Sequence, residues 1–314
     1  MKKQLFFVLA AALLTPLFVY AEDKCFPELE GKKGTQVLET LYSLIKDHTV
    51  LSYDDVRADR AGVDINKVKN TVRDIYSSCE FGVDDYCGNE SGSGECDCYN
   101  REHILPQSWW DNDNKQPMRS DLHHVVPTDV FANSQRASWP YGEVTGTPTW
   151  SNSLGSKLGY SSTYDSKVFE PADQYKGDIA RIYFYMITCY YDKNFAQSAS
   201  GKKVFTYSNG KAGFTSTAIN MLLKWHRNDP VSAKERTRNN AVEPIQGNRN
   251  PFVDAPDLAE YIWGDKKTVA YQCGTGIGHI ETQTPRATKR IENGVLILVM
   301  PDGTRYNTQG IQIR

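Results

Sequence analysis

Residues 100–139 hold the densest group of side chains that could carry out hydrolytic chemistry. Three of the six histidines lie there, together with the carboxylate of Glu102 and the amide of Asn133. A neutral imidazole such as His103 can take a proton from an attacking water, and carboxylate and amide oxygens are suitable ligands for a divalent metal ion. Magnesium accepts only one or two protein carboxylates, so Glu102 with Asn133 would be sufficient. These residue types are those needed for metal-assisted hydrolysis of a phosphodiester.

Two short strands and a helix are expected to position these side chains. The pattern predicts a strand over 102–105 ended by Pro106, a strand over 122–126 ended by Pro127, and a helix that Thr128 caps and that carries Asn133. A histidine at a strand end and an oxygen ligand on the helix would then face each other across a small cleft. Adjacent strand residues point to opposite faces, so Glu102 and His103 share a site only if the strand ends or bulges there.

The rest of the chain has mainly helical periodicity. Apolar residues at helical spacing predict amphipathic helices over 34–50 and 65–77, a buried helix over 179–191 and another over 217–225. Residues 143–165 are rich in Gly, Ser and Thr, and we expect a long loop there. Together with the strands, these elements predict an α+β fold that is mainly helical.

Four ordered motifs identify a resemblance. Between about Leu38 and Gly264 the chain is similar to the endonuclease I family of secreted and periplasmic bacterial nucleases, which belongs to the ββα-metal superfamily. The segments that carry the similarity are NREHILPQSWW at 100–110, DLHHVVPTDVFANSQR at 121–136, FEPADQYKGDIARIYFYM at 169–186, and KWHRNDP at 224–230 followed by EPIQGNRNPFVD at 243–254.

The resemblance implies nonspecific cleavage of DNA, and often of RNA, to 5'-phosphate products. The cofactor it implies is Mg2+ or another divalent cation such as Mn2+ or Ca2+. Position by position, His103 matches the general base of the family, and Glu102 and Asn133 match its metal ligands. The implied architecture is a central ββα-metal motif within a nuclease domain over residues 22–280, active as a monomer.

Several arginines are candidates for contact with phosphate, because a guanidinium can clamp a phosphate with two parallel hydrogen bonds. Arg119 stands where some family members carry an acidic residue, and Arg119 or Arg181 would share the charge of the transition state. Asp178 lies one helical turn before Arg181, so an internal ion pair is the alternative for that residue. Arg249 has a similar structural alternative, and Arg101 and Arg136 are candidates by location. A cationic stretch over 224–249 adds further positive charge.

The first 21 residues have the features of an export signal. Lys2 and Lys3 precede an apolar run over 5–19, and small residues at Val19 and Ala21 suit signal-peptide cleavage. The run is too short for a spanning helix, and no membrane span is expected in the mature chain. We therefore expect export to the periplasm, the cell surface or the medium. All seven cysteines follow the signal, so disulfides are expected, with one thiol left over and four cysteines stapling 79–98.

The net charge bears on the class of nucleic-acid partner, and the C-terminal tail bears on how the protein is sorted. Lys+Arg 36 against Asp+Glu 38 gives a net charge of -2, which excludes a broadly basic protein that coats duplexes. Residues 281–314 form a separate tail, in which 294–300, Pro301-Asp302-Gly303 and 304–306 predict a strand, a turn and a strand. The tail resembles the C-terminal sorting tails of bacterial type IX secreted proteins; the alternative is a hairpin that completes the fold. The alternative function is a surface-displayed module that binds nucleic acid without cutting it.

Overall fold

The computed structural model describes residues 24–88, 94–110, 116–273, 288–292, 295–299, 304–306 and 312–313. The chain divides into two compact units, Met1–Gln272 and Cys273–Arg314. Helices and antiparallel sheets occur together, as expected for an α+β fold. The predicted signal peptide lies outside the described residues. Among the residues that were described, no helix has the length and apolar character needed to cross a membrane.

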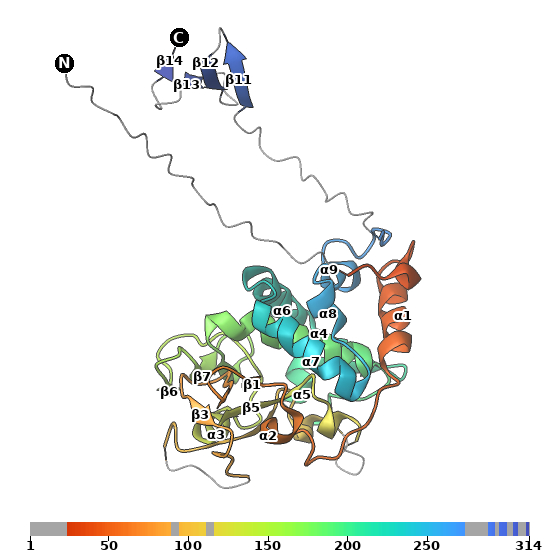
Figure 1. Cartoon of the computed structure of the whole chain (residues 1–314). Coiled ribbons are helices and arrows are strands. Elements are labelled where there is room, and N and C mark those ends of the chain that lie inside the picture. Colours follow the sequence, from red (N-terminus) through yellow and green to blue (C-terminus); the bar gives the residue numbers. More distant parts are fainter. Residues whose placement is uncertain are drawn as a thin grey trace, which may run out of the picture. The chain divides into compact units, whose positions relative to one another are not determined.

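Several helices of the first unit, among them α1, α6, α7 and α8, lie around a buried helix, α4, whereas α2 and α3 lie among the small sheets (Figure 1). Helix α4 packs against α1, α6 and α8. The predicted helices over 34–50, 179–191 and 217–225 are confirmed as α1, α4 and α6, with shifted ends. The helices are α1 (Thr35–Ile45), α2 (Ala58–Ala61), α3 (Val130–Arg136), α4 (Lys176–Cys189), α5 (Gly201–Val204), α6 (Ser216–Asn228), α7 (Ala233–Gln246), α8 (Pro251–Asp254) and α9 (Leu258–Ile262). Short 3-10 helices lie at Pro27–Leu29, Gln107–Trp109, Met118–Ser120 and Asp173–Tyr175.

The strands of the first unit form four small antiparallel sheets within the described residues. They are β1 (Ile65–Asn66), β2 (Thr71–Val72) and β3 (Phe81–Gly82); β4 (Tyr99–His103) with β5 (Val125–Asp129); β6 (Trp150–Ser151), β7 (Lys157–Ser161) and β8 (Ser166–Glu170); and β9 (Phe205–Ser208) with β10 (Lys211–Phe214). The second unit contains β11 (Thr288–Glu292), β12 (Val295–Val299), β13 (Arg305–Tyr306) and β14 (Gln312–Ile313) in one sheet. The two strands predicted in the tail correspond to β12 and β13, which pair antiparallel.

Strands β4 and β5 and helix α3 follow the predicted order of strand, strand, helix. The predicted strand bounds were wrong, because β4 covers Tyr99–His103 rather than 102–105 and β5 begins at Val125 rather than at Leu122. Two further details of the prediction were also wrong. Pro127 does not end β5; it lies inside the strand opposite Arg101. Proline has no N–H, but this position of β5 faces away from β4, so no hydrogen bond between the strands is lost. On the same outer edge of β5, the N–H of Asp129 donates to Asp74. Thr128 does not cap α3 either. The Asp129 side chain accepts a hydrogen bond from the N–H of Ala132 and is the N-cap.

Two other expectations about secondary structure were also wrong. Residues 65–77 form β1, β2 and turns rather than a helix, because the side chain of Asn66 accepts hydrogen bonds from the N–H groups of Val68 and Lys69 and closes a turn. Val68, one of the residues that made the helical pattern, is 96% exposed. The stretch 143–165 is not all loop, since it contains β6 and β7, which pair with each other.

The cysteines pair largely as expected for an exported chain. Cys79 bonds with Cys96, and Cys87 bonds with Cys98, so the four crowded cysteines do staple their loop. Cys25 and Cys273 are also disulfide-bonded. The thiol left over is Cys189, which is free and buried in α4.

Candidate active site

His103 is the last residue of β4 and is surrounded by aromatic rings. Its side chain is enclosed, with the residue only 6% exposed. The imidazole stacks on the ring of Tyr53 at 5.7 Å between centroids, and the rings of Trp110 and His124 lie beside it. Trp109 and Trp110 are both buried, and Trp110 forms part of the wall beside the histidine.

The hydrogen bonds of His103 define which ring nitrogen can accept a proton. Nε2 lies 2.9 Å from the backbone carbonyl oxygen of Arg119. A carbonyl can only accept, so Nε2 carries the hydrogen and Nδ1 keeps its lone pair. The amide nitrogen of Gln107 lies 3.3 Å from Nδ1 and donates to it. Burial, reinforced by the charges of His124 and the nearby arginines, lowers the pKa of His103 to about 3, so the imidazole is neutral at pH 7.

The guanidinium groups of Arg101 and Arg119 both lie over the ring of Tyr53, the tyrosine that stacks on His103. The guanidinium carbon of Arg101 lies 3.6 Å from the centroid of the Tyr53 ring, and that of Arg119 lies 4.0 Å from it. Arg101 also donates to the backbone carbonyl of Tyr53. Neither arginine forms an ion pair with any residue that the structure describes. Within the described part of the chain, therefore, no carboxylate neutralises the positive charge around the Tyr53 ring.

Glu102 points to the other face of the β4–β5 ribbon. Glu102 and His103 pair in regular register with Val126 and Val125, so no bulge brings their side chains together. Glu102 is 4% exposed; its Oε1 accepts from the hydroxyl of Tyr76 at 2.7 Å and lies 3.2 Å from Nε of Arg136. Burial raises the pKa of this carboxyl, although Arg136 and Tyr76 oppose the shift.

Asn133 projects from α3 towards β4. Its amide nitrogen donates to Oδ1 of Asn100 at 2.8 Å and to the carbonyl of Arg101. The amide oxygen is therefore the atom left for a cation. The side chains of Glu102 and Asn133 thus lie on the α3 side of β4, whereas the side chain of His103 lies on the side of Tyr53.

The donor set only partly fits a divalent metal. Glu102 and Asn133 supply hard oxygen atoms, and both side-chain contacts of Glu102 use Oε1 rather than Oε2. Against this, Arg136 already balances the carboxylate. Two groups of side chains within the described residues have a ligand-like spacing, His48–Asp121–Cys189 and Cys79–Cys96–Asp129, and neither contains Glu102. The second group is held by a disulfide, so its sulfur atoms are not thiolates.

Arg181 takes the internal position that the sequence left open as an alternative. It is fully buried in α4, and its guanidinium pairs with both carboxylate oxygens of Glu235, with Asp178 at 3.4 Å. In this structure a phosphate cannot reach it. Arg249 is likewise held by Asp254 and Glu243. The cationic stretch 224–249 is mostly neutralised in the same way, through the pairs Lys224–Glu143, Arg227–Glu260 and Arg238–Asp64.

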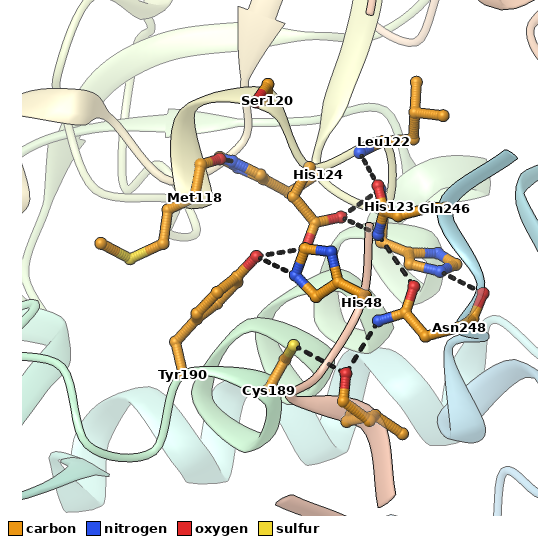
Figure 2. Close-up of polar contacts among 12 residues, drawn as sticks. His48, Met118, Ser120, Leu122, His123, His124, Cys189, Tyr190, Gln246 and Asn248 are labelled. Atoms are coloured by element: carbon orange, nitrogen blue, oxygen red, sulfur yellow. Dashed lines mark hydrogen bonds and ion pairs between the residues drawn. The ribbon is translucent and has the colours of Figure 1, made fainter. Parts of the chain in front are cut away.

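A buried polar network joins the loop after Arg119 to the helices (Figure 2). The carboxylate of Asp121 accepts from the hydroxyls of Tyr185 and Tyr190 and from the amide of Gln246. Burial acts to raise the pKa of Asp121, but its electrostatic interactions with His123, His48 and His124 and the hydrogen bond from Tyr190 outweigh this and lower the pKa to about 2. Nε2 of His48 lies 2.9 Å from the Tyr190 hydroxyl and is hydrogen-bonded to it. The network anchors the segment that presents Arg119 and His124.

Sequence reasoning missed three residues that shape the site. Tyr53 lies fifty residues before His103 in an irregular segment, and no local signal marks it. Tyr76 lies within the helix predicted over 65–77, which does not form, so no sequence signal indicated its contact with Glu102. Gln107 could have been found, because it follows His103 by four residues inside the motif HILPQS, just beyond the strand end.

Comparison with known proteins identifies the family. The family model of endonuclease I matches residues 33–257. An extracellular ribonuclease of Bacillus subtilis (strain 168) is 33% identical over 261 residues, 80% of this chain and 83% of that protein. An extracellular ribonuclease of Bacillus amyloliquefaciens is 30% identical over 81% of this chain and 82% of its own length. A periplasmic deoxyribonuclease of Aeromonas hydrophila is 25% identical over 49% of this chain and 62% of its length. The chain belongs to the endonuclease I family.

Proposed function

We propose that this protein is an exported endonuclease that hydrolyses phosphodiester bonds of DNA and RNA with little sequence specificity, leaving 5'-phosphate ends. The observation that carries the proposal is the pairing of His103 with Arg119. One hydrogen bond from Nε2 to the Arg119 carbonyl leaves Nδ1 as the basic nitrogen. The guanidinium of Arg119 lies over the Tyr53 ring, on which the imidazole also stacks, and it has no carboxylate partner among the described residues. A neutral base next to an anion-binding group is the arrangement that water attack on a phosphodiester requires.

His103 would remove the proton from the attacking water through Nδ1. The low pKa keeps the imidazole ready to accept, but a base of this pKa holds a proton weakly. A phosphodiester bound beside the ring brings negative charge, which raises the pKa of the imidazole when the proton arrives. The amide nitrogen of Gln107, 3.3 Å from Nδ1, marks the direction from which that water would approach the ring. Arg119 would bind the scissile phosphate and stabilise its growing charge.

Glu102 and Asn133 would hold the divalent cation, proposed as Mg2+ or a similar ion such as Mn2+ or Ca2+. When bound, the cation would supply Lewis-acid stabilisation of the phosphate and of the departing 3' oxygen. Oε2 of Glu102 and the amide oxygen of Asn133 are the atoms suited to it, while Tyr76 and Arg136 orient the carboxylate through Oε1. The β4–β5–α3 unit would then be a ββα-metal motif.

The names of the relatives support the substrate class and the location. They include extracellular ribonucleases and a periplasmic deoxyribonuclease, so the proposal covers both nucleic acids and export. Contacts to the sugar-phosphate backbone rather than to bases account for low sequence specificity. We propose a monomer whose residues 22–280 form the nuclease domain, with residues 281–314 as a tail that directs sorting.

The deciding experiment uses the mature, oxidised protein and supercoiled plasmid. Cleavage with magnesium, loss of cleavage in EDTA, and loss of cleavage in His103→Ala are expected. End-labelling of the products should show 5'-phosphates. A protein that retards the plasmid in a gel without shortening it, with or without EDTA, would overturn the proposal and would instead indicate a binding module.

A further inference from the structure

We propose that Arg101 forms a second phosphate subsite beside the scissile one, and that Tyr53 positions Arg101 and Arg119 for two successive phosphates of one strand. The ligand of this subsite is the backbone phosphate next to the one that is cut, in either DNA or RNA. The inference rests on the proposed nuclease function, which assigns the scissile phosphate to Arg119.

Arg101 and Arg119 differ from the other arginines around the site in whether a carboxylate neutralises their charge. Arg57 pairs with both oxygens of Asp59, and Arg136 pairs with Glu102. Arg101 and Arg119 have no carboxylate partner among the residues that the structure describes. Nε of Arg119 is also buried without a hydrogen-bond partner. An uncompensated pair of cations at the protein surface attracts an anion, and both side chains keep part of their surface exposed.

Tyr53 holds both guanidinium groups in place. Stacking on an aromatic ring fixes the plane of a guanidinium but leaves the N–H groups at its edge able to donate. Arg101 is held more firmly, because it also donates to the backbone carbonyl of Tyr53. The ring of Tyr53 lies against His103 as well, so one side chain connects the base with both cations.

The spacing along β4 assigns the two arginines to different phosphates. Arg119 is joined directly to His103 through its backbone carbonyl. Arg101 and His103 lie two residues apart on the same face of β4, which separates their α-carbons by about 7 Å. That offset is comparable with one step along a nucleic-acid backbone. A phosphate at Arg101 would therefore be a neighbour of the phosphate attacked beside His103.

Beyond Arg101, the next arginine in this part of the described structure is Arg57, which is paired with Asp59. The guanidinium carbon of Arg101 lies 5.6 Å from the centroid of the Tyr86 ring. The guanidinium carbon of Arg57 lies over the same ring, 4.2 Å from its centroid. Because Asp59 neutralises Arg57, that residue offers little attraction to a third phosphate. Arg57 is therefore the matched control: it is a guanidinium stacked on tyrosine that is already paired.

The first test compares Arg101→Gln with Arg57→Gln in the full chain. Glutamine at position 101 can still donate to the Tyr53 carbonyl, so folding should be retained, and the thermal midpoint of each variant is measured as a check. We expect Arg101→Gln to lower kcat/KM on a long single strand about tenfold and to reduce the slope of log kcat/KM against log salt by about one. Arg57→Gln should change neither. An unchanged salt slope in a folded Arg101→Gln protein would overturn the subsite.

The second test removes the neighbouring phosphate from the substrate. A dinucleoside monophosphate such as UpU contains only the scissile phosphate. Its cleavage should be equally slow in wild type and Arg101→Gln, whereas adding a terminal phosphate on the correct side should speed the wild type alone. Equal gains in both proteins would contradict the proposal. Wild-type protein that cuts neither plasmid nor oligonucleotide would instead contradict the nuclease function itself.

The third test concerns Tyr53 as a positioning residue. Tyr53→Leu should raise KM on a long strand and reduce the salt slope as Arg101→Gln does, and Tyr53→Phe should restore most of both because the ring is kept. The combination of Tyr53→Leu with Arg101→Gln should add little to either single change. Additive losses would show that the two residues act independently and would overturn the positioning role.

Discussion

The carbonyl oxygen of Arg119 accepts a hydrogen bond from Nε2 of His103 at 2.9 Å. The same residue therefore fixes the tautomer of the imidazole with its backbone, and its guanidinium has no carboxylate partner among the described residues. Asp121, two residues further on, is held by two tyrosine hydroxyls, so the loop that carries Arg119 has little freedom. The orientation of the imidazole and the position of the guanidinium are consequently set by one short segment.

Replacement of His103 by glutamine should remove the base and leave the fold intact. The amide can still donate to the Arg119 carbonyl, but it cannot take up a proton. We expect kcat to fall by about 100- to 10,000-fold. Affinity for DNA in EDTA, measured by fluorescence anisotropy, should stay within about twofold of wild type because the arginines remain. Wild-type turnover in the folded variant would exclude His103 as the base.

Gln107 should affect the rate through the imidazole rather than through binding. Its amide nitrogen contacts Nδ1 of His103, and its amide oxygen is buried without a partner. In Gln107→Leu the attacking water loses an orienting neighbour, so kcat should fall about tenfold with little change in KM. Steady-state kinetics on a labelled oligonucleotide would measure both. A rise in KM at constant kcat would instead place Gln107 in substrate binding.

The local parts of the site were predictable from sequence, and the parts built by distant residues were not. The motif around His103 revealed the base candidate, the strand and the helix with Asn133, because their signals lie within forty residues. Tyr53 reaches the same site from an irregular segment without periodicity. Which arginines are free also depends on tertiary pairing: Arg119 has no acidic partner among the described residues, whereas Arg181 is enclosed by Glu235.

The failed secondary-structure predictions share a physical cause. Apolar spacing in 65–77 matched a helix, but a hydrogen-bonding Asn66 side chain closed a turn and left Val68 in solvent. Pro127 looked like a strand end because proline cannot donate, yet it fits a strand whose outer edge has no partner at that residue. Both errors arise where hydrogen bonding outweighs the pattern of apolar residues.

The buried pair of Arg136 and Glu102 should be costly to break on one side. Arg136 is 1% exposed, and Arg136→Met leaves the Glu102 carboxylate buried opposite a neutral side chain. We expect a loss of about 3–5 kcal/mol in the free energy of unfolding, measured in urea. The double variant Arg136→Met with Glu102→Gln should recover much of this loss, because no uncompensated charge remains. Additive losses in the double variant would show that the pair is not coupled.

The two disulfides within residues 79–98 should differ in their effect on α3. The N–H of Cys96 donates to the carboxylate of Asp129, which caps α3, so the Cys79–Cys96 bridge supports the helix that carries Asn133. Removing this bridge by Cys79→Ser with Cys96→Ser should cost about 3 kcal/mol of stability. It should also weaken magnesium-dependent cleavage. Cys87→Ser with Cys98→Ser is the matched control, expected to lower stability with less effect on the magnesium requirement. Equal shifts in the magnesium concentration needed would refute this assignment.

His226 should make the protein less stable in acid. It is buried in α6, with Nε2 at 3.0 Å from the carbonyl of Pro256 and Nδ1 facing Arg181, and Glu235 and Glu260 lie around it. Burial and the charge of Arg181 lower its pKa to about 4.

Because the pKa of His226 is lower in the folded than in the unfolded chain, the unfolded chain binds more protons between about pH 6.5 and about pH 4. The free energy of unfolding should therefore fall as the pH falls through this window, by up to about 1.4 kcal/mol per pH unit from this residue. His226→Gln cannot titrate, so the difference in stability between wild type and variant, measured by urea unfolding at each pH, should shrink on acidification. A difference that stays constant across the window would show that His226 does not contribute to the acid sensitivity.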